Sequence, residues 1–121
     1  CFAEKKGYSK FGSYTGNGSS DGPFIYTGFR PAWVLVKAIT GTSSWTILDN
    51  KRNTSNPMGK GLFPDDTAAE YDYTNRRDFY SNGFKIRNTS SAENTSGTVH
   101  IYMAFAESPF VNSNGVPTNA R

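Results

Sequence analysis

The side chains that most often perform catalysis or bind soft metals are scarce in this chain. It has one histidine, His100, and one cysteine, Cys1, and a structural zinc site needs more ligands than these two. His100 falls inside an apolar run, with no sequence signal for an oriented nucleophile or acid beside it, so a strand histidine facing solvent or an interface is favoured. No phosphate-binding glycine pattern occurs. The sequence therefore predicts a protein that is not an enzyme, with no catalytic residue, no metal and no cofactor.

Aromatic and amide side chains in the expected loops fit a different chemistry, which is weak recognition of sugars. Sugar rings stack on aromatic faces, while their hydroxyl groups pair with amides, carboxylates and backbone groups. The candidate ligand contacts are Tyr8, Tyr26, Trp45, Tyr71, Tyr73, Asn17, Asp21 and Asn75. The alternative for the aromatic residues is a structural role, because Trp45 lies in a strand run and tyrosines often line the rim of a core.

Oxygen ligands of the kind that calcium prefers gather at two places, Asp65-Asp66-Thr67 and Asp49-Asn50. Neither has the spacing of an EF-hand, so turn and cap roles are favoured for these aspartates. The sequence leaves the binding of calcium open.

The charge balance indicates neither a nucleic-acid partner nor insertion into a membrane. The net charge is +3, from 13 Lys and Arg against 10 Asp and Glu. The basic doublets Lys5-Lys6, Lys51-Arg52 and Arg76-Arg77 are scattered, which is typical of solvated strand ends and loops. No apolar run approaches the roughly 18 residues of a membrane span.

Composition favours an all-β fold. Ser, Thr, Asn and Gly make up 48 of the 121 residues, and aromatic residues make up 15%. Disordered chains lack the aromatic residues, and helical bundles lack this much Thr, Asn and Gly. Short strands with turn signals every ~8–12 residues predict an antiparallel β-sandwich, jelly-roll or lectin-like, with little or no helix.

The clearest strands are residues 98–106 and 33–39, which alternate with period two. Both faces of 98–106 are largely apolar, so we expect a central strand. We expect the following side chains among the most buried: Val99, Ile101, Met103, Phe105, Trp33, Leu35 and Phe84. The opposite face of this strand, with Tyr102, Ala104 and Ala106, would then offer a flat patch to a partner.

Turn residues predict two hairpins. Residues 41–43 connect 33–39 to 44–49, and Ser81-Asn82-Gly83 connects 78–80 to 84–87, where Asn-Gly tolerates positive φ angles. Weaker strand candidates cover 8–14 and 24–29, separated by an almost pure loop. A helical turn is expected only at 65–70, after Pro64.

The tripeptide Phe-Ala-Glu occurs at residues 2–4 and again 103 residues later, at 105–107. If it closes the last strand of a unit, the first residues belong to a preceding copy in a tandem array. The predicted organisation is therefore the end of a preceding module or a linker over 1–6, a β-sandwich domain over 7–108, and a C-terminal tail over 109–121.

Five segments together resemble a known kind of module: residues 7–37, 49–57, 62–70, 78–87 and 97–110, among them LFPDDTAAE, DFYSNGFKIR and GTVHIYMAFAESPF. They are similar to the tandem C-terminal module of tail-fibre-like virion structural proteins of marine bacteriophages. The resemblance implies a β-sandwich on the virion surface, outside the cell, and a homo-oligomer that is a trimer if it forms a fibre. It carries over no catalytic residue.

Two classes of function follow from these observations. The first is a tail-fibre or appendage domain that binds a host receptor or glycan. The second is a purely structural subunit, such as a self-assembling spacer or a capsid decoration, without a ligand. The expected partners are further copies of the chain, other virion proteins and a host-surface glycan.

Overall fold

The computed structural model describes residues 1–109 and 112–114 of the chain. It contains eight strands and one short helix, α1, of four residues. The strands are β1 (Ser9–Thr15), β2 (Phe24–Tyr26), β3 (Pro31–Ala38), β4 (Thr46–Asp49), β5 (Met58–Leu62), β6 (Tyr71–Tyr80), β7 (Gly83–Ile86) and β8 (Val99–Ala106), and α1 spans Ser91–Asn94. The prediction of an antiparallel all-β fold with little helix is confirmed.

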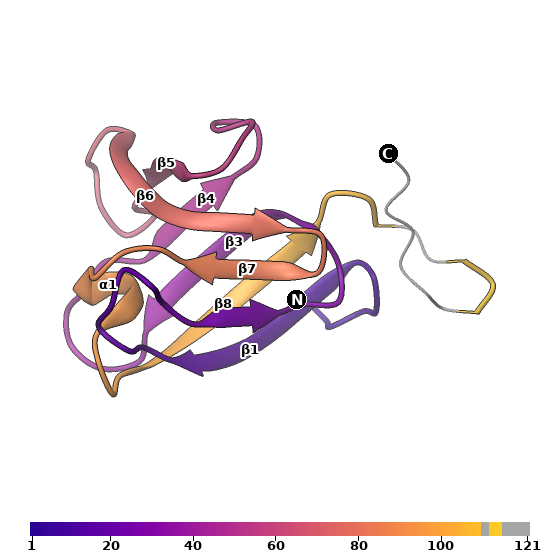
Figure 1. Cartoon of the computed structure of the whole chain (residues 1–121), viewed down its shortest axis with the longest axis horizontal. Helices are drawn as coiled ribbons and strands as arrows, with labels where there is room; N and C mark the ends of the chain where they lie inside the picture. The colour runs from indigo at the N-terminus through magenta and orange to yellow at the C-terminus, as the bar shows by residue number, and fades with distance from the viewer. Residues whose placement is uncertain (110–111, 115–121) are drawn as a thin grey trace.

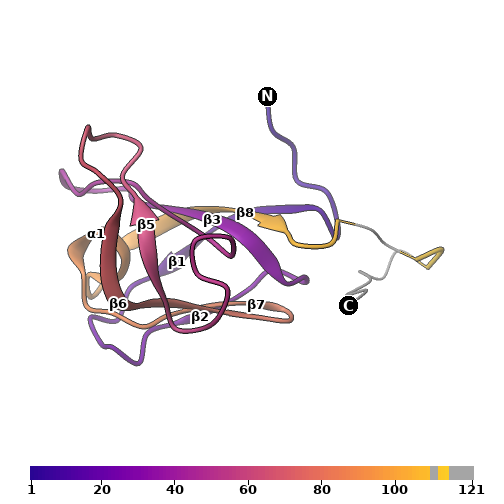
Figure 2. The same ribbon diagram turned by 90° about the horizontal axis from the view of Figure 1, so that it is seen from above.

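All eight strands belong to one antiparallel sheet in the order β1-β8-β3-β4-β5-β6-β7-β2 (Figure 1). The sheet curls into a nearly closed barrel, with β1 and β2 as its two edges. Seen from above, β3 and β8 lie on one side and β7 and β2 on the other (Figure 2). The two layers expected of a sandwich are thus two halves of one continuous sheet, joined through β4, β5 and β6.

The core fills the space between these halves. Phe84 on β7 meets Tyr102 on β8 edge to face, with ring centroids 5.4 Å apart, and it also meets Tyr14 on β1 at 6.5 Å. Val34 and Val36 on β3 are completely buried. Such contacts join strands that are far apart in the sheet order, and they hold the curled sheet closed by apolar burial.

The predicted inward face of β8 is wrong, and of the seven side chains predicted to be most buried only Phe84 on β7 is fully buried. Ile101 is 48% exposed, and the other five residues are only partly buried: Val99, Met103, Phe105, Trp33 and Leu35. The buried side chains of β8 are His100, Tyr102 and Ala104. Alternation defines the two faces of a strand but does not say which one faces inward, and here both faces are largely apolar.

Both predicted hairpins are present. β3 pairs with β4, and β6 pairs with β7 across Ser81 and Asn82. Phe84 points inward as expected, and so does Ile86. Gly83, however, does not have a positive φ angle. A Cβ atom there would lie 2.2 Å from the carbonyl oxygen of Ile25, so glycine allows β2 to approach β7 closely.

The helix is not at the position that the sequence predicts. Residues 65–70 form turns and irregular backbone, while α1 lies at Ser91–Asn94. β5 was not expected, because its Met-Gly-Lys-Gly-Leu sequence lacks β-branched residues.

The expected N-terminal segment 1–6 lies ahead of β1, and its Phe2 is 69% exposed, with its ring packed against that of Phe105 at 5.8 Å. The assignment of this segment to a preceding module stays a prediction. Most of the expected tail, 109–121, lies outside the described residues.

Candidate functional site

Charged side chains from two elements, β6 and α1, meet inside the barrel. Arg77 on β6 is fully buried, and its Nη1 donates to the carbonyl oxygen of Val34 at 2.8 Å. Its Nη2 donates to the hydroxyl of Thr46 and to Oε1 of Glu93 at 3.0 Å. Arg76, the preceding residue, has its Nε 3.5 Å from the same Glu93 oxygen. One buried carboxylate therefore faces two guanidinium groups.

Glu93 reaches this position because α1 closes one end of the barrel. Ser90 caps the helix, its hydroxyl accepting from the backbone N–H of Ala92 at 3.3 Å. The buried side chain of Asn94 donates to the carbonyl oxygens of Ser19 at 2.6 Å and Asn88 at 2.8 Å. These bonds fix the helix against two loops and direct Glu93 into the interior.

Glu93 is held in its charged form. Burial alone would raise the pKa of its carboxyl group, but Arg77, Arg76 and a hydrogen bond from Asn88 Nδ2 at 2.7 Å together hold that pKa below its ordinary value. The backbone carbonyl of Glu93 also accepts from the hydroxyl of Tyr14 at 2.6 Å. Burial raises the pKa of Tyr14 far above its usual range, so this hydroxyl remains a donor.

Arg76 is less well paired than Arg77. Its guanidinium carbon lies over the rings of Tyr71 and Tyr73, at 5.3 and 5.4 Å from their centroids. Its side chain is only 9% exposed, yet its Nε finds no hydrogen-bond partner in the part of the chain that the structure describes. Tyr71 and Tyr73 are themselves stacked, with centroids 5.0 Å apart, and they hold the guanidinium in place.

Arg76 lines a surface hollow of about 340 Å³, which we call the Arg76 hollow. Around it stand four serines, two aromatic rings and one alanine: Ser43, Ser44, Ser90, Ser91, Phe63, Tyr73 and Ala92. Of the described residues that line it, Arg76 alone is charged. An aromatic wall, several hydroxyl groups and one cation give this hollow the features of a small polar-ligand site.

Two of the predicted sugar contacts meet here. Tyr73 is 54% exposed and presents its ring to the hollow, whereas Tyr71 is buried behind it, stacked on Phe63 at 4.5 Å. Tyr71 therefore supports the site and does not line it. The sequence predicted the two tyrosines but not their shared arginine.

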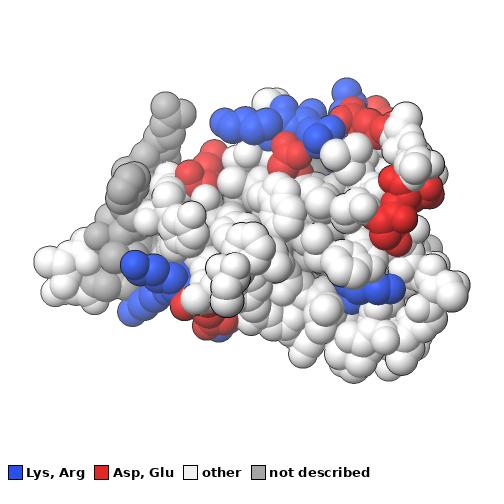
Figure 3. Space-filling model, turned by 180° about the vertical axis from the view of Figure 1, so that it is seen from behind, with Lys and Arg blue, Asp and Glu red and all other residues white. Residues whose placement is uncertain are grey.

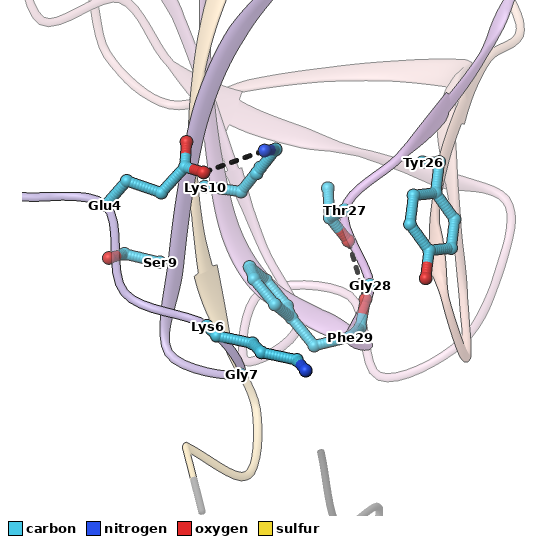
Figure 4. A pocket seen from close by; sticks show the side chains of 9 residues that line it. All are labelled: Glu4, Lys6, Gly7, Ser9, Lys10, Tyr26, Thr27, Gly28 and Phe29. Carbon is cyan, nitrogen blue, oxygen red and sulfur yellow. Dashed lines mark hydrogen bonds and ion pairs between the residues drawn. The ribbon is translucent and has the colours of Figure 1, made fainter. Parts of the chain in front are cut away.

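Tyr26 lies at a second hollow, of about 470 Å³, at the seam between β1 and the connection from β2 to β3 (Figure 4). Across this hollow Lys10 Nζ donates to Oε1 of Glu4 at 2.8 Å. The hydroxyl of Thr27 donates to the carbonyl oxygen of Phe29 at 2.7 Å. Since these polar groups already bond to one another, the seam hollow is less suited to a polar ligand than the Arg76 hollow.

Asn17 and Asp21 organise the loop between β1 and β2. Asn17 Nδ2 donates to the carbonyl oxygen of Asp21 at 2.9 Å, and its backbone N–H donates to Asn94 Oδ1 at 2.9 Å. The carboxylate of Asp21 forms an ion pair with Lys85 at 2.6 Å, and this bond lowers the pKa of Asp21.

Asn75 lies on β6 directly before Arg76, but it is not among the residues that line the Arg76 hollow. It has a φ angle of 62° and lines a third hollow together with Asp78 and Arg87, which form an ion pair at 3.4 Å. Because Asn17, Asp21 and Asn75 do not line the Arg76 hollow, the structure does not gather the predicted polar contacts in one site.

Trp45 belongs to a broad apolar surface on the outside of β1, β8 and β3, and Tyr8 contacts this surface through the ring of Phe105 at 6.1 Å. We define this apolar face by its partly exposed side chains: Phe11, Trp33, Leu35, Trp45, Ile101, Met103 and Phe105. It contains a shallow hollow of about 590 Å³. Seen from behind, this side of the molecule has few charged groups across its centre, and the charged groups lie mostly toward its rim (Figure 3).

Three interpretations of charged and catalytic residues need correction. The doublet Arg76-Arg77 is buried and not solvated, because Glu93 and backbone carbonyls compensate its charge. His100 is fully buried, with its ring stacked on Tyr14 at 5.2 Å, and it faces neither solvent nor an interface. The third is the statement that the sequence has no signal for a nucleophile: Gly18-Ser19-Ser20-Asp21-Gly22 has the Gly-x-Ser-x-Gly pattern of a nucleophile elbow, but it lies in a loop between two strands and not between a strand and a helix.

The role of Glu93 was missed, although a signal for it exists. Ser90-Ser91-Ala92-Glu93 has the spacing of a helix-capping box. In the structure Ser90 caps the helix, but its N–H donates to Asn88 Oδ1, and the Glu93 carboxylate turns to Arg77 and Asn88 instead. That signal could have located α1 and so placed a glutamate at the end of the barrel.

Among the described residues, no group of three or more His, Cys, Asp or Glu is arranged to hold a metal ion. The aspartates of the two calcium candidates bond to the backbone: Asp49 Oδ1 accepts from the N–H groups of Lys51 and Arg52, and Asp65 Oδ1 accepts from that of Trp45, each at 2.9 Å.

Within the described residues, no helix has the length and apolar character needed to span a bilayer.

A family model described as a domain of unknown function (DUF7483) matches residues 1–109. Comparison with curated proteins and comparison with solved structures find no match.

Proposed function

The chain belongs to the DUF7483 family, and we propose that it is the surface-binding domain of a bacteriophage tail fibre or appendage, where it binds a host-surface glycan. The resemblance of the five segments named above to modules of marine phage tail-fibre-like proteins supports the setting. In that setting the domain lies on the virion surface, as part of a homo-oligomer and beside other virion proteins.

The observation that carries the binding role is the Arg76 hollow. A sugar ring presents an apolar face of C–H groups and an edge of hydroxyl groups. Tyr73 offers an exposed ring for the face, while the hydroxyls of Ser43, Ser90 and Ser91 are suited to the edge. The stacked Tyr71 behind Tyr73 keeps the platform rigid, which lowers the entropy lost on binding.

We expect the isolated domain to bind a subset of an array of bacterial surface glycans, and replacement of Tyr73 by alanine to weaken that binding about tenfold. The affinity for the best glycan is measured by titration calorimetry on both proteins. Tyr80→Ala is the matched control, because Tyr80 is another partly exposed tyrosine of β6 that does not line the hollow. Failure to bind any glycan, or equal losses in the two variants, would contradict the proposal.

The apolar face favours the second function, that of a self-assembling structural subunit. Trp33 and Phe11 both pack against Phe105, and this aromatic group continues into Leu35 and Met103. One charged residue, Lys37, also lines the hollow in this face. A contiguous apolar surface of this kind commonly marks an interface. The flat patch expected at Tyr102 and Ala104 cannot serve, because both side chains are buried.

If this second function holds, the domain is expected to form a dimer or trimer at micromolar concentration, and Ile101→Asp is expected to make it monomeric. Ile101 is 48% exposed on β8, the middle strand of the face, so a carboxylate there disrupts the interface without entering the core. Light scattering after size-exclusion chromatography gives the mass. A wild-type domain that is monomeric at every concentration argues against the structural role.

A further inference from the structure

We propose that the Arg76 hollow recognises a carboxylated sugar, whose carboxylate is bound by the guanidinium of Arg76. The proposal rests on the proposed glycan-binding function and names the class of sugar. It follows from the charge balance, the hydrogen bonds and the shape of this one site.

The charges around Glu93 do not balance. Arg76 and Arg77 supply two positive charges, and Glu93 supplies one negative charge. Arg77 Nη2 holds Glu93 Oε1 at 3.0 Å and Asn88 holds Oε2 at 2.7 Å, so both oxygens of the carboxylate already have close partners. Arg76 lies 3.5 Å away and retains most of its capacity for another anion.

Arg76 also has hydrogen-bonding capacity to spare. A buried donor without a partner is unfavourable, and native structures rarely contain one without a reason. The Nε of Arg76 and that of Arg77 are both such donors in the described part of the chain, and the Nε of Arg76 faces Glu93 at 3.5 Å. Arg77 is fully buried, whereas Arg76 lines a hollow that is open to solvent. The planar guanidinium fork matches the two oxygens of a carboxylate better than an ammonium group does.

The surroundings select an anion that is attached to a sugar. Tyr73 and Phe63 provide ring faces, and the serine hydroxyls can bind the hydroxyl groups of the ligand. At the rim, Lys37 Nζ donates to the carbonyl oxygen of Ser43 at 2.9 Å, and Asp65 accepts from Trp45. These two opposite charges offset each other, so the net positive charge of the hollow comes from Arg76.

The test compares ligands that differ only in their acid group. Trigalacturonic acid is compared with its methyl ester, and sialyllactose with the methyl ester of its sialic acid carboxyl group, by titration calorimetry on the wild-type domain. We expect at least one acidic ligand to bind about tenfold or more tightly than its neutral counterpart, in line with a charge-assisted hydrogen bond. This preference should fall as the salt concentration rises.

Arg76→Met is expected to abolish the preference, because it keeps the aliphatic stem against the tyrosines and removes the charge. Arg76→Lys keeps the charge but not the fork, and it is expected to retain only part of the preference. Arg87→Met is the matched control, since Arg87 is an arginine that does not line the Arg76 hollow, and it should leave the preference unchanged. Thermal unfolding verifies that each variant is folded.

Neutral and acidic ligands that bind equally, or a preference that survives in Arg76→Met, would overturn the inference while the glycan-binding function stands. Inorganic phosphate that binds as tightly as the acidic sugars would overturn it too, by showing an anion site without sugar selectivity. Absence of binding to every sugar, on the array and in these titrations, would refute both proposals.

Discussion

Replacing Glu93 by glutamine is expected to lower the free energy of unfolding by about 3–5 kcal/mol, because it leaves two buried guanidinium groups without their anion. Arg77 is completely buried, so solvent cannot replace its lost carboxylate, and the side chain of Arg76, only 9% exposed, gains little from solvent. Urea denaturation followed by tryptophan fluorescence measures the change.

Two further variants separate this effect from a general loss of charge. Glu107→Gln breaks an exposed pair with Arg30, and it should cost less than about 1 kcal/mol. If Glu93→Gln alone does not fold, the double variant Arg77→Met/Glu93→Gln should recover a cooperative transition, since it removes one of the stranded charges. A loss below about 1 kcal/mol for Glu93→Gln would show that the buried cluster does not contribute as the geometry indicates.

The same substitution has a defined pH dependence. The pKa of Glu93 is lower in the folded protein than in the unfolded chain, so its stabilising effect is complete above the unfolded value of about 4.3 and is lost as the pH falls through the folded value. The difference in stability between wild type and Glu93→Gln should therefore be largest near neutral pH and shrink below about pH 5. Glu4 and Asp21, whose pKa values are also lowered, are present in both proteins and cancel in the difference.

The strands of this fold could be predicted from the sequence because period-two alternation and turn residues are local signals. The partners of Arg77 could not. Its side chain bonds to Val34 and Thr46, which lie 43 and 31 residues away, and to Glu93, 16 residues away. Only the curl of the sheet and the capping of α1 bring these groups together, so the doublet Arg76-Arg77 looks like ordinary surface charge in the sequence.

The candidate site could be predicted from the sequence only in part, for a similar reason. Tyr71 and Tyr73 were chosen by residue type, and the structure brings both to Arg76, because alternate residues of a strand share a face. The serines of the hollow come from the loop after β3 and from the segment around α1. No spacing rule connects these segments, since their distance in space depends on the closure of the barrel.

The second large expected effect concerns which face of β8 points into the core. Ala104→Asp is expected to abolish cooperative folding, whereas Ile101→Asp should leave the domain folded. Ala104 is fully buried, opposite Val34 on β3 and Lys10 on β1, and an aspartate there places a carboxylate and extra volume in a packed core. Ile101 is 48% exposed on the outer surface, so its replacement costs at most about 1 kcal/mol of strand propensity.

Circular dichroism and the dispersion of amide resonances report on folding in both variants, which lie on the same central strand and receive the same side chain. The two variants therefore share the strand and the added charge, and they differ mainly in whether the side chain points into the core or out to the surface. The face chosen from the sequence, with Ile101 inward, requires the reverse result: an unfolded Ile101→Asp and a folded Ala104→Asp. Such a result would move His100 and Tyr102 to the surface, and the core between β8 and β7 would have to be rebuilt around Met103 and Phe105.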